Sequence, residues 1–282
     1  MKIEKAKKLG LCFGVRRAIK LLKQAVNQYG EIETLGPVAH NRRLVEALAN
    51  LRIKPINQLD QAQGRILAIT THGVSPAILS EVKARQMHII DTTCPIVRKA
   101  QNTAKGLAEA GFDVIIFGDT QHSEVKGLLG WTGDKGIAAL DVAQISTLKK
   151  SLSRLGIISQ TTQTQVAFIE FIRQLMNMVG PEIEEMRVVN TLCKVTQRQQ
   201  EAALELARKT QLMIVVGGSN SANTRHLAEI CSPLVETHLV ETADEVDTSW
   251  LVNKQHIGVT AGASTPDEAV EELIAKLRSL CF

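Results

Sequence analysis

The chain repeats one pattern three times, and this repeat constrains its fold more than any other feature of the 282 residues. Cys12, Cys94 and Cys193 open three comparable segments, LCFGVRRAIKLLKQA, TCPIVRKAQNTAKGLAEA and LCKVTQRQQEAALELARK. Each segment continues with apolar residues at helical spacing, so each cysteine precedes a predicted helix. The apolar runs in MHIIDTTC and MRVVNTLC predict a buried strand directly before the second and third cysteines.

The repeat extends to two further loops in each segment. After each helix comes an apolar run and a polar loop, in IETLGPVAHN, DVIIFGDTQHSE and LMIVVGGSNSAN. His40, His122 and Ser221 each lie 28 positions after their cysteine (12 to 40, 94 to 122, 193 to 221). A third strand with its own polar loop follows in ILAITTHGVS, LGIISQTTQT and HIGVTAGAST, which present His72, Thr161 and Ser264.

Strands that alternate with helices predict parallel sheets, and ligands bind beyond the carboxyl ends of such strands. We therefore expect an α/β trefoil of three pseudo-threefold-related units, each with a small, mainly parallel sheet, around a shared centre. The expected units are residues 13–93, 94–192 and 193–282. By analogy with the runs before Cys94 and Cys193, the N-terminal strand within residues 1–12 is expected to complete the third unit.

Three cysteines at one repeated position bring three thiols towards one axis. Clustered thiolates without histidine partners at fixed spacing favour an iron–sulfur cluster or zinc. A cubane cluster usually takes four cysteines, so three would leave one iron with an open position. Threefold placement fits a cubane better than zinc, and each following helix directs partial positive charge at it. Cys231 and Cys281 break the repeat and are assigned to packing.

The repeated loops also carry polar side chains that suit an anion. Imidazole, hydroxyl and amide groups donate hydrogen bonds to oxygen-rich anions such as diphosphate. Glu124 is the one carboxylate in the set, and it is predicted to deliver protons with a pKa raised by burial. Its alternative role is a surface ion pair with Lys126. The full set of loop residues is His40, His72, His122, Glu124, Thr161, Ser221, Asn223 and Ser264.

Composition argues against several other classes of protein. The net charge is +4, the basic residues are scattered, and aromatic residues make up 3% of the chain, so a nucleic-acid surface is not expected. No apolar run approaches the roughly 20 residues that span a bilayer. The charged N-terminus MKIEKAKKLG is unlike a secretory signal, so we expect a cytoplasmic protein with no membrane partner.

Eight motifs resemble the family of LytB-type 4-hydroxy-3-methylbut-2-enyl diphosphate reductases, iron–sulfur enzymes that end the non-mevalonate pathway of isoprenoid biosynthesis. The resemblance covers essentially the whole chain. It implies one [4Fe–4S] cluster per chain on Cys12, Cys94 and Cys193, with the substrate oxygen on the open iron. The motifs are GLCFGVRRAI, GPVAHN, THGVS, DTTCPIV, GDTQHSEVKG, SQTTQT, VVGGSNSANT and TAGASTPD.

The resemblance also implies the reaction and the roles of individual residues. Two electrons and two protons remove the hydroxyl of the allylic diphosphate as water, which gives isopentenyl diphosphate and dimethylallyl diphosphate. Reduced ferredoxin or flavodoxin is the expected electron donor. Glu124, His122 and Thr161 are the implied catalytic residues. The implied diphosphate-binding residues are His40, His72, His122, Ser221, Ala222, Asn223 and Ser264.

Ala222 departs from the family pattern, which commonly has a second serine there. We expect weaker substrate binding and an unchanged reaction, because one hydroxyl donor is missing.

Two other functions compete with the reductase. A three-cysteine iron–sulfur dehydratase would use the open iron only as a Lewis acid and would need no electron donor. A metal-stabilised anion-binding protein or redox sensor would not catalyse a reaction. Glu124 discriminates between catalysis and binding. A protein that only binds an anion has no need for a carboxylate beside it, and the repulsion would weaken binding.

Overall fold

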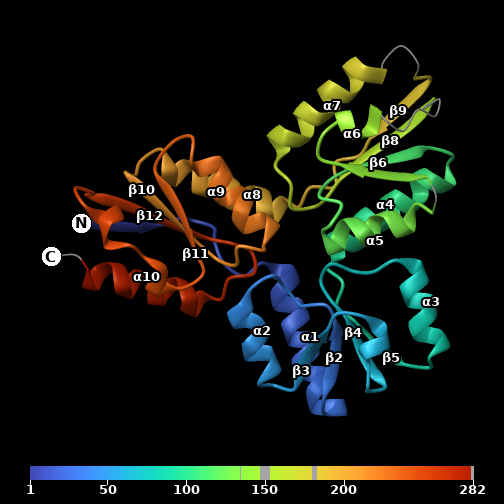
Figure 1. Cartoon of the computed structure of the whole chain (residues 1–282), viewed down its shortest axis with the longest axis horizontal. Coiled ribbons are helices and arrows are strands. Elements are labelled where there is room, and N and C mark those ends of the chain that lie inside the picture. The colour runs from blue at the N-terminus through green and yellow to red at the C-terminus, as the bar shows by residue number, and fades with distance from the viewer. Residues whose placement is uncertain (134, 147–152, 180–182, 281–282) are drawn as a thin grey trace.

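The computed structural model describes residues 1–133, 135–146, 153–179 and 183–280. Three α/β units surround a common centre, and each contains one four-stranded sheet (Figure 1). All strand pairs in the three sheets are parallel. The predicted α/β trefoil is therefore confirmed. Cys281 lies outside the described residues.

The first sheet has the strand order β3-β2-β4-β5. Its strands alternate with helices, as expected for parallel strands that need a crossover connection. The elements of this part of the chain are α1 (Phe13–Tyr29), β2 (Ile32–Leu35), α2 (Arg42–Ala49), β3 (Ile53–Ile56), η1 (Leu59–Gln61), β4 (Ile66–Ile69), α3 (Pro76–Ala84) and β5 (His88–Asp91).

The second sheet has the equivalent order β7-β6-β8-β9. Its elements are α4 (Pro95–Glu109), β6 (Asp113–Phe117), α5 (Ser123–Trp131), β7 (Gly136–Ala139), α6 (Ala143–Ser146), β8 (Arg154–Ser159), α7 (Gln165–Val179) and β9 (Glu185–Val188).

The third sheet joins the two ends of the chain. Its order is β1-β12-β10-β11, and β1 pairs with β12 from Lys2↔His256 to Lys5↔Val259. In each sheet, the edge strand before a cysteine thus lies beside the strand that bears the third polar loop. The elements are β1 (Lys2–Lys5), α8 (Lys194–Ala207), β10 (Leu212–Val216), α9 (Ala222–Cys231), β11 (Thr237–Val240), η3 (Ala243–Glu245), η4 (Thr248–Leu251), β12 (His256–Ala261) and α10 (Asp267–Ser279).

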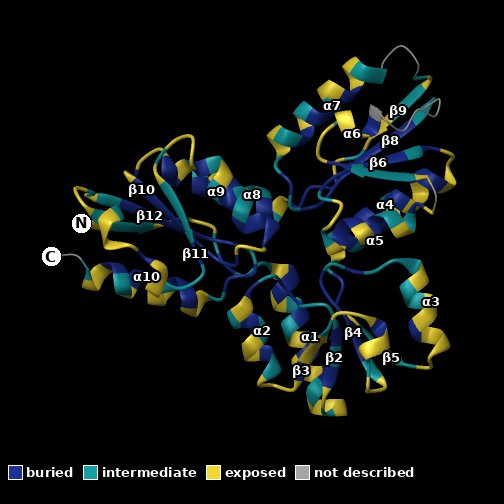
Figure 2. Ribbon diagram, in the orientation of Figure 1, coloured by how far each residue is buried: buried dark blue, intermediate teal, exposed yellow. Residues whose placement is uncertain are grey.

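Every sheet is covered by helices on both faces, which explains the continuous apolar runs in its central strands. In β10, Ile214 and Val216 pack in a cluster with α10, whereas Met213 and Val215 pack in a second cluster with α8 and α9. Cys231 is fully buried in that second cluster. Buried residues occupy the central strands of the sheets, and exposed ones the outer faces of the helices (Figure 2). The unit boundaries at 13–93, 94–192 and 193–282 stay a prediction.

In the described part of the chain, no helix has both the length and the apolar character required to cross a membrane.

Candidate active site

The three cysteines occupy equivalent structural positions. Cys12, Cys94 and Cys193 are the N-cap residues of α1, α4 and α8. Their backbone N–H groups donate to the carbonyl oxygens of Ala263, Thr71 and Thr161 at 3.0, 3.1 and 2.8 Å respectively. Each bond joins a cysteine to the loop after the neighbouring strand of its sheet. In each unit the strand before the cysteine, this hydrogen bond and the helix that follows the cysteine position its thiol, and all three cysteines line one cavity.

The thiols of Cys12 and Cys94 lie on either side of Gly14, and Cys193 lines the same cavity. A Cβ atom on Gly14 would lie 2.7 Å from the Sγ of Cys94 and 3.8 Å from that of Cys12, so only glycine fits between them. Burial raises the pKa of the Cys12 and Cys94 thiols, and the neighbouring cysteines raise it further. Three free thiols without histidine among them form the donor set of an iron–sulfur cluster that lacks one protein ligand. These residues therefore fit the cluster implied by the sequence.

Three histidines line the same cavity beside the thiols. The ring centroids of His40 and His72 are 4.8 Å apart, and His122 lies 5.4 and 5.5 Å from them. His122 is the N-cap residue of α5, His40 directly precedes the N-cap residue of α2, and His72 follows β4. One ring nitrogen from each lies within 4.8 Å of the others.

Burial keeps these histidines neutral. It is the main cause that lowers the pKa of each ring, to about 4 for His122 and well below the ordinary value for His72. The positive charge of Arg225 adds to this effect at His40 and His122. The Nδ1 of His122 accepts the backbone N–H of Glu124 at 3.2 Å, so the neutral ring carries its proton on Nε2. His122 thus presents an N–H donor to the cavity.

Glu124 and Thr161 form a buried pair in the same cavity. The Thr161 backbone N–H donates to Glu124 Oε1 at 2.7 Å, and its hydroxyl donates to Oε2 at 2.9 Å. The Glu124 side chain is 1% exposed, and burial raises its pKa to about 7 although both hydrogen bonds act in the opposite direction. The carboxyl therefore exchanges a proton near neutral pH. Lys126, the alternative partner, makes no ion pair with it in the described structure.

The third unit supplies hydroxyl and amide groups at the N-terminus of α9. Ser221 is the N-cap residue, and its hydroxyl accepts the Thr224 N–H at 3.4 Å. Both amide atoms of Asn223 are buried and have no hydrogen-bond partner in the described structure. An unpaired buried amide is costly, so its placement in the cavity indicates that a polar ligand completes its hydrogen bonds. The Ser264 hydroxyl donates to the His40 carbonyl oxygen at 3.4 Å.

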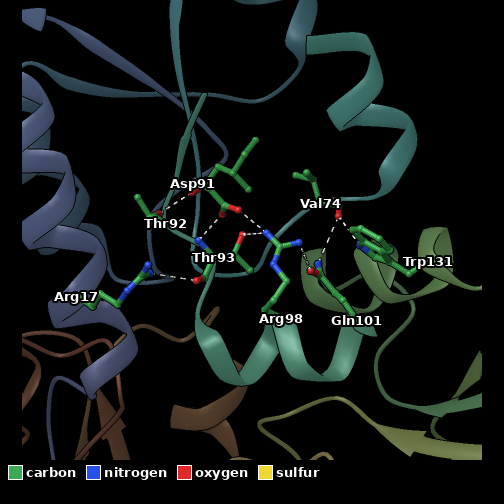
Figure 3. Close-up of polar contacts among 9 residues, drawn as sticks. Arg17, Val74, Asp91, Thr92, Thr93, Arg98, Gln101 and Trp131 are labelled. Atoms are coloured by element: carbon green, nitrogen blue, oxygen red, sulfur yellow. Dashed lines mark hydrogen bonds and ion pairs between the residues drawn. The ribbon is translucent and has the colours of Figure 1, made fainter. Parts of the chain in front are cut away.

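A polar network holds the loop of His72 against the second unit (Figure 3). The Val74 carbonyl oxygen accepts hydrogen bonds from Trp131 Nε1 at 2.9 Å and from Gln101 Nε2 at 3.4 Å. Arg98 Nη1 donates to Gln101 Oε1 at 3.0 Å, and the same guanidinium forms an ion pair with Asp91. The network thereby couples the His72 loop to the first turns of α4, whose N-cap residue is Cys94.

The cavity brings together every residue for which the sequence predicts a role in the site. All are within its lining, which comprises Cys12, Cys94, Cys193, His40, His72, His122, Glu124, Thr161, Ser221, Ala222, Asn223 and Ser264 among others. Their individual roles stay predictions.

Sequence reasoning missed several residues of the lining. Val15, Val97 and Thr196 all line the cavity, and each lies three positions after its cysteine, so the repeat itself carried this signal. Arg225 affects two of the histidines, and it lies 32 positions after Cys193, an offset at which the second segment has Lys126 and the first has Leu44. His226, for which the sequence predicts no role, contacts the Thr162 carbonyl oxygen through Nδ1 at 2.9 Å.

The remaining histidines lie elsewhere in the molecule. His88 packs against Tyr29, His238 stacks on Trp250, and His256 contacts Glu4.

Comparisons with known proteins cover almost the whole chain. Residues 3–278 match the model of the family described as LytB protein. A 4-hydroxy-3-methylbut-2-enyl diphosphate reductase of Dehalococcoides mccartyi (strain CBDB1) is 42% identical over 280 residues, which are 99% of this chain and 99% of that one. An enzyme of the same name from Geobacter sulfurreducens is 37% identical over 279 residues, covering 99% of this chain and 97% of the relative.

Two solved structures share the fold. One is described as (E)-4-hydroxy-3-methyl-but-2-enyl diphosphate reductase, the terminal enzyme of the non-mevalonate pathway. It has 33% identity, a TM-score of 0.71 and coverage of 99% of this chain and 100% of that one. The other is E-1-hydroxy-2-methyl-but-2-enyl-4-diphosphate reductase from Plasmodium falciparum, with 26% identity, a TM-score of 0.90 and coverage of 97% and 87%.

Proposed function

The chain belongs to the LytB protein family, and we propose that it reduces 4-hydroxy-3-methylbut-2-enyl diphosphate to isopentenyl diphosphate and dimethylallyl diphosphate. It is an oxidoreductase. In the proposed reaction, two electrons and two protons break the allylic C–O bond, form a C–H bond and release water. The single observation that carries the proposal is one cavity that contains three thiols, three neutral histidines and a buried, protonatable glutamate.

The diphosphate occupies the histidine side of the cavity in this proposal. His40, His72 and His122 donate ring N–H groups to its oxygens, while Ser221, Asn223 and Ser264 add hydroxyl and amide donors. Support comes from the unpaired Asn223 amide, whose buried atoms need such a ligand. Binding energy from the diphosphate then fixes the reacting end of the substrate beside Glu124 and the thiols.

Cys12, Cys94 and Cys193 would hold one [4Fe–4S] cluster, which supplies single-electron transfer and a Lewis-acid iron when it is bound. Glu124 delivers a proton to the departing hydroxyl, because a buried carboxyl with a pKa of about 7 is a suitable general acid near neutral pH. Thr161 orients that carboxyl through two hydrogen bonds and lies in the path of the proton. His122 belongs to the proposed diphosphate-binding residues, and its Nδ1 accepts a hydrogen bond from the backbone N–H of Glu124.

The other two functions make different demands on the site. An iron–sulfur dehydratase would convert its substrate without added reductant. A binding protein or redox sensor would tolerate the loss of the Glu124 carboxyl. The electron donor is expected to be reduced ferredoxin or flavodoxin, and the cytoplasmic location also stays a prediction.

Turnover by the cluster-loaded protein tests the proposal. Under anaerobic conditions, with dithionite as reductant, the chain is expected to convert the allylic diphosphate to the two products, and without reductant it should convert none. Glu124→Gln should retain substrate binding and lose nearly all turnover, roughly 10²–10⁴-fold, the usual contribution of a general acid. Glu109→Gln on the outer face of α4 serves as the matched control and should behave as the unmodified protein.

Mössbauer spectroscopy with iron-57 tests the metal site independently of turnover. One iron of the four should give a distinct signal that moves when substrate is added. Protein that binds zinc, or no metal, through the three cysteines would contradict the proposed cofactor. Full turnover by Glu124→Gln would contradict proton delivery by Glu124.

A further inference from the structure

A second groove lies beside Cys12, and none of the three histidines of the central cavity lines it. It has a volume of about 620 Å³. The segment between β1 and α1, the first turns of α8 and the first turns of α10 form its walls. In Figure 1 these elements lie near the N-terminal strand, on the opposite side of the molecule from α3.

Cys12 is the cysteine that connects the two cavities. It lines both the second groove and the central cavity, whereas Cys94 and Cys193 line only the central one of these two. The adjacent Phe13 also lines the groove, and its side chain is 63% exposed. This exposed aromatic ring directly follows a partly buried cysteine of the central cavity and provides an apolar contact point beside it.

The groove has an excess of positive charge. Lys5, Lys7, Lys8 and Arg198 line it together with two carboxylates, Asp267 and Glu271. Both carboxylates are already paired, Glu271 with Lys5 at 2.8 Å and Asp267 with Arg16 at 3.0 Å. Lys7 pairs with Glu205 at 3.3 Å. Lys8 and Arg198 are exposed and have no ion pair among the described residues, so their charges face solvent.

The walls of the groove are held in place. Gln199 Nε2 donates to the Gly10 carbonyl oxygen at 2.8 Å, which joins α8 to the segment before Cys12. Arg16 Nε donates to the Leu11 carbonyl oxygen at 3.0 Å and its guanidinium also binds Asp267. A partner therefore meets a preformed surface and loses little affinity to ordering it.

We propose that this groove docks a small acidic electron-carrier protein, which contacts Phe13 and is attracted by Lys8 and Arg198. The inference rests on the proposed function, because a reductase of this kind needs electrons from outside the chain. Each reduced carrier would give one electron to the cluster that Cys12, Cys94 and Cys193 would hold, and would leave oxidised. Two such encounters and two protons convert the substrate C–OH to C–H and one water.

Charge reversal tests the groove with a matched control. Lys8→Glu combined with Arg198→Glu inverts the two unpaired charges of the groove. Lys83→Glu combined with Lys99→Glu inverts two exposed cations on α3 and α4, which also have no ion pair in the described structure. None of the four residues lines the central cavity.

Binding is measured first, with an oxidised plant-type [2Fe–2S] ferredoxin as an acidic probe and the cluster-loaded chain in a calorimeter at low salt. We expect the groove variant to raise Kd about tenfold or more and the control variant to change it less than about twofold. Affinity for the unmodified chain should fall steeply with added salt. Equal losses in both variants would show a non-specific charge effect and overturn the proposal.

Electron delivery is measured second, by two routes on the same proteins. With reduced ferredoxin, the groove variant should react about ten times more slowly in stopped-flow experiments, and Phe13→Ala should raise the KM for ferredoxin without changing the KM for substrate. With dithionite, all variants should turn over normally. Unimpaired reaction of the groove variant with ferredoxin would reject the docking site, whereas absence of dithionite turnover in the unmodified chain would reject the proposed function.

Discussion

Glu124 is a residue whose surroundings change its acid–base chemistry. The side chain is buried, and its pKa lies at about 7 rather than 4.5 because the charged form is poorly solvated there. Two hydrogen bonds from Thr161 limit this shift and fix the orientation of the carboxyl. The raised pKa of Glu124 therefore affects both catalysis and stability. The carboxyl is readily protonated near neutral pH, and its ionised form destabilises the folded state.

Glu124→Gln is expected to make the substrate-free protein more stable at alkaline pH. The folded pKa is about 7 and the ordinary value is 4.5, so the folded protein binds the proton more tightly. The stabilisation from Glu124 is thus complete below pH 4.5 and is lost as the pH rises through 7. Between pH 5 and pH 8 the stability of the variant relative to the unmodified protein should rise by roughly 2–3 kcal/mol. Urea unfolding at the two pH values measures this difference.

Glu109→Gln provides the control for this titration, since Glu109 is exposed on α4 and, among the described residues, forms an ion pair with Lys105 alone. Its difference from the unmodified protein should stay constant with pH. A constant difference for Glu124→Gln as well would mean that the carboxyl is ionised with an ordinary pKa in the folded protein.

Ala222→Ser is expected to tighten binding of the diphosphate without changing the reaction. Ala222 is the first residue of α9, lies buried and lines the cavity next to Ser221 and Asn223. A serine hydroxyl there would add one donor to the anion, worth roughly 1 kcal/mol or about fivefold in Kd. Titration calorimetry and kcat measurements separate the two effects. An unaltered Kd would show that the Ala222 side chain does not face the bound diphosphate.

Residues at repeated positions are those that the sequence predicts best. His40, His122 and Ser221 share one offset from their cysteines, and that offset places all three in the cavity. Arg225 shares its offset from the cysteine with Lys126 but with Leu44 in the first segment, so the repeat carries only a partial signal for a cation there. Its effect on His40 and His122 depends on contacts between units, about which spacing along one segment contains no information.

Among the elements, the strands before and after each cysteine-capped helix follow from the repeat. The fourth strands of the sheets, β3, β7 and β11, do not. They are short edge strands of four residues, and they contain weak strand signals such as Pro55 in IKPI and the small residues of GIAA. Pairing with the buried central strands β2, β6 and β10 makes them strands, which is a tertiary effect.

Trp131→Phe is expected to loosen the loop that carries His72. Trp131 Nε1 donates to the Val74 carbonyl oxygen at 2.9 Å, and Gln101 makes the longer second bond to the same oxygen (Figure 3). Phenylalanine keeps the apolar contact but removes the stronger donor, at a cost of about 1 kcal/mol in the free energy of unfolding. We expect substrate Kd to rise several-fold while kcat changes less, because His72 binds substrate and Glu124 is unaffected. Calorimetry and steady-state kinetics check this split.

Trp250→Phe is the matched control, because Trp250 stacks on His238 in the outer part of the third unit. It should leave substrate affinity unchanged. Equal effects of both substitutions on Kd would show that general destabilisation, rather than the position of His72, is responsible.

At the scale of the whole molecule, few strong contacts hold the three units to one another. Arg16–Asp267 and Arg43–Glu272 join α1 and α2 to α10, but both ion pairs are largely exposed. Exposed pairs contribute only about 0–1 kcal/mol each. Hydrogen bonds between the units lie nearer the centre, such as Trp131 Nε1 to the Val74 carbonyl oxygen and His226 Nδ1 to the Thr162 carbonyl oxygen, both at 2.9 Å. The proposed cluster would therefore be the main cross-link, since each of its three ligands begins a helix of a different unit.

Removal of the cluster is accordingly expected to lower the melting temperature of the whole chain. A ligand present at about 1,000 times its Kd stabilises by about 4 kcal/mol, which corresponds to roughly 10 °C for a chain of this size. Calorimetry of cluster-loaded and chelator-treated protein under anaerobic conditions measures the difference. Cys94→Ser should abolish most of that difference, because two thiols hold the cluster poorly.

Cys231→Ala separates the loss of a metal ligand from the loss of a buried thiol. Cys231 is fully buried in the hydrophobic core cluster that contains Met213 and Leu227, and it does not line the cavity. Its substitution should lower the melting temperatures of the cluster-loaded and the chelator-treated protein equally, so the difference between the two temperatures should persist. A gap that disappears in Cys231→Ala but persists in Cys94→Ser would place the metal elsewhere. If the loaded and stripped proteins melt together, the three units hold one another without the cluster, and the polar loops alone form the centre of the trefoil.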